Sequence, residues 1–198
     1  FVRPHSPLDP PQAYFDLYKN IDLPEPPVGD WVAESAAAAK ANDPTMTVGR
    51  LPKRRLDRAR AAYYALITHL DDQIGRLLSA LQEYGVLKET LILFTSDHGE
   101  LMGDHHLFRK TLPYEGSAKV PFLLFDPGGR LGFKAGMRAV EVVELRDIMP
   151  TLLDAAGAPI PASVEGVSLL PLCRGDITPW RNYIHGEHAY GEKSHHFA

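Results

Sequence analysis

The chain has 198 residues, of which 44% are hydrophobic and 23% are charged, a composition typical of a soluble globular protein with a sizeable core. Its formal net charge of −4 argues against a nucleic-acid-binding protein, which usually carries a basic excess. The single cysteine excludes an internal disulfide framework, and the sequence has no run of 18 apolar residues that would predict a membrane span.

The first fifty residues predict mostly irregular chain. Residues 1–11 hold four prolines and predict a loop, and residues 12–19 predict one or two turns of helix. Residues 21–53 predict a long surface excursion with one short helix. Loops of this length are uncommon in compact domains and are often functional, so we expect the excursion to line a substrate entrance.

The strongest helix signal lies in residues 54–84. Apolar residues recur there at spacings of four and three, which places them on one stripe of a helix: Tyr63, Ile67, Leu70, Ile74, Leu77 and Leu81. Gly85 follows as a stop signal. Residues 90–95 then predict a buried strand, so that helix, turn and strand together indicate an α/β unit.

The second half of the chain alternates between strand and helix signals. In chain order, the predicted elements are a strand at residues 120–125, a strand at 140–143, a helix at 146–156, a helix at 168–174 and a strand at 183–188. We therefore expect an α/β fold in which helices flank a mixed sheet. Asp147 lies at the start of a predicted helix, where a carboxylate favours the helix dipole, and we expect it to support the architecture.

The strand predicted at residues 90–95 ends in the most informative motif of the chain, Thr-Ser-Asp-His-Gly-Glu at residues 95–100. Open α/β sheets hold ligands at the carboxyl ends of their strands. A carboxylate beside an imidazole can reach one divalent cation, so Asp97 and His98 are candidate metal ligands. The alternative is that Asp97 caps the turn that follows and His98 is a simple structural residue.

Lys110 follows thirteen residues after Asp97. Its ammonium group is a compact charge with three donors, which suits an oxyanion such as sulfate or phosphate and would stabilise charge on ester oxygens. The alternative is an exposed surface lysine, which is where most lysines lie.

His5 stands between Pro4 and Pro7, which restrict the backbone and would fix the direction of the imidazole. A histidine suits general-acid chemistry near neutral pH, so His5 is a candidate catalytic residue. The alternative is a loop histidine that makes one hydrogen bond.

The other histidines are weaker candidates for substrate binding. His105 and His106 lie between the metal pair and Lys110, although turn residues beside the site would explain them equally well. His185 and His188 belong to a predicted strand, whose alternation would put them on opposite faces. We expect substrate contact from these four residues less strongly than from His5 and Lys110.

Three segments together resemble the type I sulfatases of the alkaline phosphatase superfamily. They are Phe-Thr-Ser-Asp-His-Gly-Glu at residues 94–100, Gly-Asp-His at 103–105 followed by Lys110, and Pro-Tyr-Glu-Gly-Ser-Ala-Lys-Val-Pro at 113–121. The likeness extends from around Phe1 to around Arg181. It implies that residues 1–198 are the C-terminal portion of an alkaline-phosphatase-like three-layer catalytic domain.

The resemblance also implies roles for the candidate residues. Asp97 and His98 would ligate Ca²⁺, Lys110 would contact the sulfate, and His5 would protonate the leaving oxygen. The expected substrate is a sulfated small molecule or carbohydrate, and neither a nucleic acid nor a membrane span is expected. Members of the family often work in the periplasm, in the lysosome or outside the cell. The sequence does not predict an oligomeric state.

The family's nucleophile motif does not occur in the chain. Type I sulfatases carry Cys-x-Pro-x-Arg or Ser-x-Pro-x-Arg, whose first residue becomes a formylglycine that attacks the sulfur, whereas Cys173 is followed by Arg-Gly-Asp. The Asp-Asp pair that would complete the calcium site is also expected to precede Phe1. We therefore expect that these 198 residues alone do not hydrolyse sulfate esters and that the complete protein does.

Two alternatives remain open. A phosphonate monoester hydrolase or phosphodiesterase of the same superfamily can share the Asp-His and lysine pattern, although residues 113–116 favour a sulfatase. A non-catalytic fragment or pseudoenzyme would keep the fold and act only as a binding or structural domain.

Overall fold

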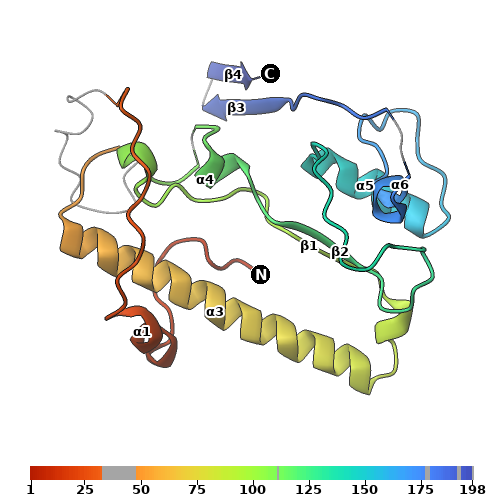
Figure 1. The fold of residues 1–198 in the computed structure, drawn as a ribbon, viewed down its shortest axis with the longest axis horizontal. Helices are drawn as coiled ribbons and strands as arrows, with labels where there is room; N and C mark the ends of the chain where they lie inside the picture. Colours follow the sequence, from red (N-terminus) through yellow and green to blue (C-terminus); the bar gives the residue numbers. More distant parts are fainter. Residues whose placement is uncertain (33–47, 111, 177–178, 191–192, 198) are drawn as a thin grey trace. The chain divides into compact units, whose positions relative to one another are not determined.

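The computed structural model describes residues 1–32, 48–110, 112–176, 179–190 and 193–197, with backbone alone from residue 187 onward. Figure 1 shows the elements in chain order. The chain divides into two compact units, which we describe separately. Unit 1 comprises Phe1–Glu83 and His98–Val120, and unit 2 comprises Tyr84–Asp97 and Pro121–Ala198. The described residues 21–32 of the predicted excursion form no helix, and residues 33–47 lie outside the described residues, so the short helix expected within residues 21–53 stays a prediction.

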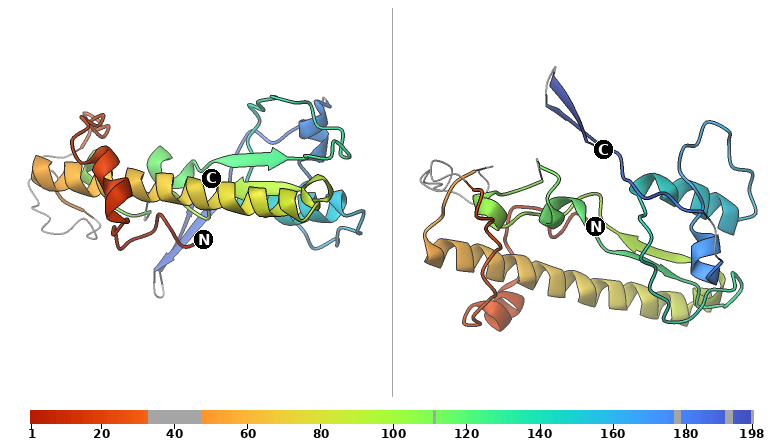
Figure 2. Two further views of the ribbon diagram at one scale, coloured as in Figure 1. Left: turned by 90° about the horizontal axis from the view of Figure 1, so that it is seen from below. Right: turned by 45° about the horizontal axis from the view of Figure 1, so that its top comes forward.

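Unit 1 is built on α3 (Lys53–Glu83), a helix of 31 residues that confirms the prediction for residues 54–84. The helix predicted at residues 12–19 is also confirmed, as α1 (Gln12–Tyr18). Figure 2 shows α1 against the half of α3 that comes first in the chain. The Tyr14 hydroxyl of α1 donates a hydrogen bond of 2.6 Å to the Asp72 carboxylate of α3, which ties the two helices together.

The apolar stripe predicted on α3 is only partly buried. Ile67 and Leu77 are 40% and 50% exposed. The buried residues of α3 lie instead in its first half and are mostly small: Ala59, Ala61, Ala62, Ala65 and Leu66. Leu51 and Phe108 form a core cluster there with Leu56 of α3. Periodicity therefore predicted the helix but not its covered part, because the covering segments come from distant parts of the chain.

The rest of unit 1 is short structure around the sequence motifs at residues 98–120. It contains η2 (Asp104–His106) and α4 (Glu115–Ala118). The turn at residues 101–110 is held by backbone bonds from the Leu101 N–H to the Arg109 carbonyl (2.9 Å) and from the Gly103 N–H to the Leu107 carbonyl (2.8 Å). This turn is the part of unit 1 that carries Lys110.

Unit 2 begins with η1 (Leu87–Glu89) and β1 (Ile92–Thr95), and β1 pairs with β2 (Phe122–Phe125). The pairing is antiparallel, with Ile92 opposite Phe125. These two strands confirm the strands predicted at residues 90–95 and 120–125. The expected burial of the first strand is wrong, because Phe94 is 38% exposed and the other residues of β1 are half-buried. In the described residues every paired strand is antiparallel, so the mixed sheet stays an expectation for the complete protein.

The strand predicted at residues 140–143 is wrong. These residues form no strand in the structure. Val140 is 91% exposed, and the Val142 carbonyl accepts a hydrogen bond of 2.7 Å from the indole of Trp180. A side chain thus takes a carbonyl that a neighbouring strand would use, and the apolar alternation did not reveal this.

The two helices predicted in this half are confirmed. They are α5 (Ile148–Ala155), which follows η3 (Leu145–Asp147), and α6 (Leu170–Arg174). Gly157, at a φ of 65°, follows α5 as expected, and Pro150 is tolerated because it lies in the first turn. The strand predicted at residues 183–188 begins later, as β3 (Gly186–Tyr190), which pairs antiparallel with β4 (Lys193–Phe197). No described helix has the length and apolar character that a membrane span requires.

Asp147 is fully buried and joins three parts of unit 2. Its carboxylate accepts two hydrogen bonds from Arg181, at 2.6 and 2.7 Å, and others from the backbone N–H groups of Val167 (3.0 Å) and Glu144 (2.8 Å). Burial acts to raise the pKa of Asp147, but the hydrogen bonds from Arg181 and the backbone outweigh it and hold the pKa below its usual range. These bonds agree with the architectural role expected for Asp147.

Candidate active site

His5, His98 and Lys110 come together in unit 1. The ammonium of Lys110 lies 3.2 Å from Nε2 of His5, across 105 residues of sequence. The His5 and His98 rings meet edge to face, with centroids 6.0 Å apart. The structure therefore brings together the sulfate-contact, proton-transfer and metal-ligand candidates that the sequence named separately.

The contacts of His5 indicate its tautomer. Its Nδ1 lies 2.8 Å from the carbonyl oxygen of Ser6, which can only accept, so Nδ1 carries the proton. The lone pair of Nε2 then faces Lys110, whose ammonium donates to it. His5 has to receive a proton at Nε2 before it can act as a general acid.

Arg3 positions His5, a role that the sequence did not reveal. Its guanidinium donates to the backbone carbonyls of His5 (3.2 Å) and Pro7 and forms an ion pair of 2.6 Å with Asp9. These contacts close the loop around the imidazole in addition to the restriction from the prolines. Nothing in the spacing of Arg3 and His5 predicts that an arginine would hold its neighbour's backbone.

Glu100 positions the turn that carries Lys110, and this role was also missed. Its carboxylate accepts a hydrogen bond from the Arg109 N–H and lies 3.4 Å from the Met102 N–H. Arg109 has a φ of 66°, in the left-handed region that non-glycine residues rarely adopt. The carboxylate therefore stabilises an unfavourable backbone conformation directly before Lys110.

The Asp-His-Gly motif is fixed by backbone contacts. Nδ1 of His98 lies 2.8 Å from the Gly99 carbonyl, which puts its proton on Nδ1 and its lone pair on Nε2, a form in which histidine binds metals. The Gly99 N–H donates to the Ser117 carbonyl at 2.7 Å. A Cβ at Gly99 would lie 2.2 Å from the Gly116 carbonyl oxygen, so only glycine allows this approach.

Asp97 and His98 have the donor chemistry of a partial calcium site. Asp97 follows β1 and is exposed, and it offers a carboxylate next to the imidazole in the chain. Calcium takes six to eight ligands, mostly oxygens. Among the described residues no three His, Cys, Asp or Glu side chains are grouped so as to hold a metal ion. A calcium site that uses these two residues therefore needs further ligands.

His105 and His106 have different surroundings. The His105 ring accepts a hydrogen bond of 3.1 Å from the Gly29 N–H and packs against Trp31 and Tyr114. Burial, with the positive charge of Arg50, lowers the pKa of His106, which favours its neutral form. His106 is therefore poorly suited to bind a sulfate by charge.

His185 and His188 belong to unit 2 and are described apart from His5 and Lys110. The His185 N–H donates to the Glu144 carboxylate at 2.8 Å, and the side chain of His188 lies outside the described residues. Substrate contact by either residue stays a prediction. Cys173 lies in α6, where burial raises the pKa of its thiol and so disfavours a nucleophilic thiolate.

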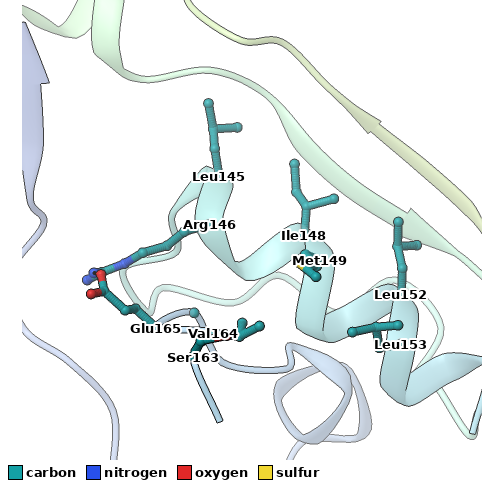
Figure 3. Close-up of a pocket in the computed structure, with 10 residues that line it drawn as sticks. Leu145, Arg146, Ile148, Met149, Leu152, Leu153, Ser163, Val164 and Glu165 are labelled. Carbon is teal, nitrogen blue, oxygen red and sulfur yellow. Dashed lines mark ion pairs between the residues drawn. The ribbon is translucent and has the colours of Figure 1, made fainter. Parts of the chain in front are cut away.

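A groove in unit 2 follows η3 and α5 (Figure 3). Leu145, Ile148 and Leu152 lie along one side of it, and Arg146 pairs with Glu165 at 3.5 Å. An apolar lining whose arginine is already paired with a carboxylate does not suit an oxyanion. The groove contains none of the residues that the sequence named as catalytic, so we assign the candidate active site to His5, His98 and Lys110.

Comparison with solved structures places this architecture in a known class. The chain resembles a phosphonate monoester hydrolase of Silicibacter pomeroyi with a TM-score of 0.81 and 31% sequence identity. The match covers 94% of the chain and 39% of the hydrolase. The fold is that of the alkaline phosphatase superfamily. The family model described as Sulfatase matches residues 1–158. The chain belongs to the sulfatase family.

Curated relatives agree with this family. An arylsulfatase of Clostridium perfringens is 57% identical over 197 residues, which cover 100% of the chain and 41% of the relative. Human arylsulfatase K is 44% identical over 124 residues, which cover 63% of the chain and 22% of the relative. The chain thus spans less than half the length of these relatives.

Proposed function

We propose that the complete protein is a sulfuric ester hydrolase that acts on sulfate monoesters, and that residues 1–198 are the C-terminal portion of its catalytic domain. The observation that carries the proposal is the contact of 3.2 Å between Lys110 Nζ and His5 Nε2, next to the His98 ring. Membership of the sulfatase family and 57% identity with an arylsulfatase support the same reaction. The expected substrate is a sulfated small molecule or carbohydrate.

Each of the two residues has a defined task in this proposal. Lys110 donates from Nζ to the sulfate oxygens and stabilises the negative charge that grows on them. His5 takes up a proton at Nε2 from solvent and delivers it to the leaving alcohol oxygen. Removing one contact of this kind typically costs about 2.7–4 kcal/mol, or ~10²–10³ in rate.

A metal ion and a nucleophile would supply the remaining chemistry. Asp97 and His98 would supply two of the ligands of a Ca²⁺ ion, which when bound withdraws charge from the ester oxygens. The nucleophile would be a formylglycine in a Cys-x-Pro-x-Arg or Ser-x-Pro-x-Arg motif, which does not occur in the printed sequence. We infer that residues 1–198 alone do not turn over sulfate esters, and robust turnover by them alone would overturn this inference.

The second candidate is a phosphonate monoester hydrolase or phosphodiesterase. The TM-score of 0.81 to the Silicibacter pomeroyi enzyme favours it, because that likeness covers 94% of the chain. A third candidate, a non-catalytic member of the family, would lack the nucleophile motif in its complete sequence. Reading that sequence for the motif separates the third candidate from the other two.

A paired activity assay tests the proposal. The complete protein, purified with calcium, is assayed on 4-nitrophenyl sulfate and on an aryl phosphonate monoester, as wild type and as the variants Lys110→Ala and Lys119→Ala. Lys119 is the control because its side chain is 73% exposed and pairs with Glu115. We expect sulfate turnover that collapses in Lys110→Ala and persists in Lys119→Ala. Turnover of the phosphonate alone would move the protein to the second candidate class.

A further inference from the structure

Three aromatic rings form a cluster in unit 1, and the catalytic steps proposed above use none of them. The Trp31 and Tyr114 rings stack with centroids 5.5 Å apart and an interplanar angle of 19°. The His105 ring lies 4.9 Å from Trp31 and 4.7 Å from Tyr114, tilted against both. We call Trp31, His105 and Tyr114 the ring cluster.

Backbone contacts hold the ring cluster in one arrangement. The His105 N–H donates to the Pro27 carbonyl at 2.8 Å, and the Gly29 N–H donates to Nδ1 of His105 at 3.1 Å. A Cβ at Gly29 would lie 2.4 Å from the Trp31 indole nitrogen, so the absent side chain makes room for the indole. The His105 backbone has a φ of 53°, which these bonds help to stabilise.

The ring cluster combines this fixed geometry with access to solvent. Trp31 is 62% exposed, while His105 and Tyr114 are half-buried. A rigid, exposed aromatic face offers stacking area without the entropy loss of ordering a flexible side chain. Single exposed aromatic residues are common. The indole of Trp31 differs because it packs against the rings of His105 and Tyr114, which makes it a preorganised surface.

Two rings of the cluster flank the sulfate-contact candidate in the sequence. His105 lies five residues before Lys110 and Tyr114 lies four residues after it. Both ends of this segment are anchored, by the bond from the Leu101 N–H to the Arg109 carbonyl and by the Tyr114 carbonyl, which accepts from the Ser117 N–H at 2.9 Å. The third ring comes from the excursion at residues 21–53, which the sequence predicted to line a substrate entrance.

We propose that the ring cluster is a binding subsite for an aromatic ring in the alcohol portion of the sulfate ester, with Trp31 as its main stacking surface. This inference rests on the proposed function, because it takes Lys110 as the residue that binds the sulfate. The ring of the ester stacks on the exposed indole while its sulfate reaches Lys110. Trp31 is then a residue that determines specificity, and His105 is a positioning residue that holds the indole.

The test compares two sulfate esters in the complete protein. One is 4-nitrophenyl sulfate, and the other is 2,2,2-trifluoroethyl sulfate, which has no ring. The variants are Trp31→Ala, Trp31→Phe and the control Tyr84→Ala, which removes an 82% exposed ring outside the cluster. We expect Trp31→Ala to lower kcat/KM for the aryl ester about 2- to 10-fold, mainly through KM, as the loss of one aromatic contact predicts. Turnover of the trifluoroethyl ester should stay unchanged, Trp31→Phe should restore most of the loss, and Tyr84→Ala should affect neither ester.

Two results would overturn the subsite: an equal loss on both esters, or an unchanged KM for the aryl ester in Trp31→Ala. A binding measurement tests the subsite separately from the proposed function. Binding of 4-nitrophenol to the wild-type protein and to Trp31→Ala is measured by calorimetry. If neither ester is hydrolysed, the proposed function fails, yet weaker binding of 4-nitrophenol in Trp31→Ala still supports the subsite. Equal binding by both proteins overturns it.

Discussion

Arg181 forms a bidentate ion pair with Asp147, in which Nη1 lies 2.6 Å from Oδ2 and Nη2 lies 2.7 Å from Oδ1. The side chains are 11% and 0% exposed, so neither charge is well solvated. Removing one partner of such a pair leaves a buried charge uncompensated and typically costs about 3–5 kcal/mol. The pair therefore predicts a large stability effect at a position to which no chemistry is assigned.

We predict that Arg181→Ala strongly destabilises the complete protein. The control is Arg130→Ala, which breaks the exposed pair between Arg130 and Glu89, whose side chains are 59% and 55% exposed. Exposed pairs are typically worth less than about 1 kcal/mol. Urea unfolding of both variants measures the difference, and equal midpoints for Arg181→Ala and Arg130→Ala would contradict the prediction.

The same carboxylate predicts a pH dependence of stability. Hydrogen bonds from Arg181 and the backbone hold the pKa of Asp147 below its usual range, despite the opposing effect of burial. The unfolded chain then takes up a proton at higher pH than the folded one. The contribution to stability is therefore full above the unfolded pKa, about 4, and is lost as the pH falls through the folded pKa. The stability difference between wild type and Asp147→Asn should be larger at pH 7 than at pH 3, and a difference that grows on acidification would refute the account.

Two glycines predict opposite effects of the same substitution. Gly75 lies inside α3, where an added Cβ would have no atom within 4 Å, whereas a Cβ at Gly99 would lie 2.2 Å from the Gly116 carbonyl oxygen. Alanine is favoured over glycine in a helix interior by about 0.5–1 kcal/mol. Gly75→Ala should raise the unfolding midpoint, and Gly99→Ala should lower it and reduce activity. A tolerated Gly99→Ala would show that the motif does not pack as described.

Glu100 predicts an effect on activity through Lys110. Glu100→Ala removes the acceptor for the Arg109 N–H, and hydrogen bonds to charged groups are worth about 1.5–3 kcal/mol, so kcat/KM on an aryl sulfate should fall at least ~10-fold. Glu100→Gln keeps an acceptor oxygen and should retain most of the activity. Glu115→Ala, at an 82% exposed carboxylate, is the matched control. Loss in Glu100→Gln as severe as in Glu100→Ala would point to a role of the charge itself.

Helical periodicity and short apolar runs in the sequence predicted the longest helix and the first two strands. The periodicity of residues 54–84 predicted α3, and the apolar runs before the Asp-His motif and before Asp126 predicted β1 and β2. Val140–Val143 shows the limit of this reasoning, since the same kind of run forms no strand when Trp180 takes the Val142 carbonyl. Chain neighbours did not reveal which part of α3 is covered, because Leu51 and Phe108 are brought there by tertiary packing.

The sequence named the residues of the candidate site but not the contacts that hold them in place. His5, His98 and Lys110 were named from motifs, and the structure brings them together. The turn that presents Lys110 uses non-glycine residues at positive φ, namely Met102, His105, His106 and Arg109, which no turn signal in the sequence indicates. The partners of His105 lie in residues 27–31, so its place in the ring cluster could not be read from its own segment.

The measurement that tests the central claim most directly is a double-mutant cycle on Lys110 and His5 in the complete protein, with kcat/KM for 4-nitrophenyl sulfate as the readout. If the two residues act together, Lys110→Ala and His5→Ala should each lower it by ~10²–10³. The double variant should then lose less than the product of the two single losses, because groups in contact couple by about 0.5–3 kcal/mol. A Lys110→Ala variant with the kcat/KM of the wild type would contradict the account. A double variant whose loss in kcat/KM equals the product of the two single losses would contradict it as well.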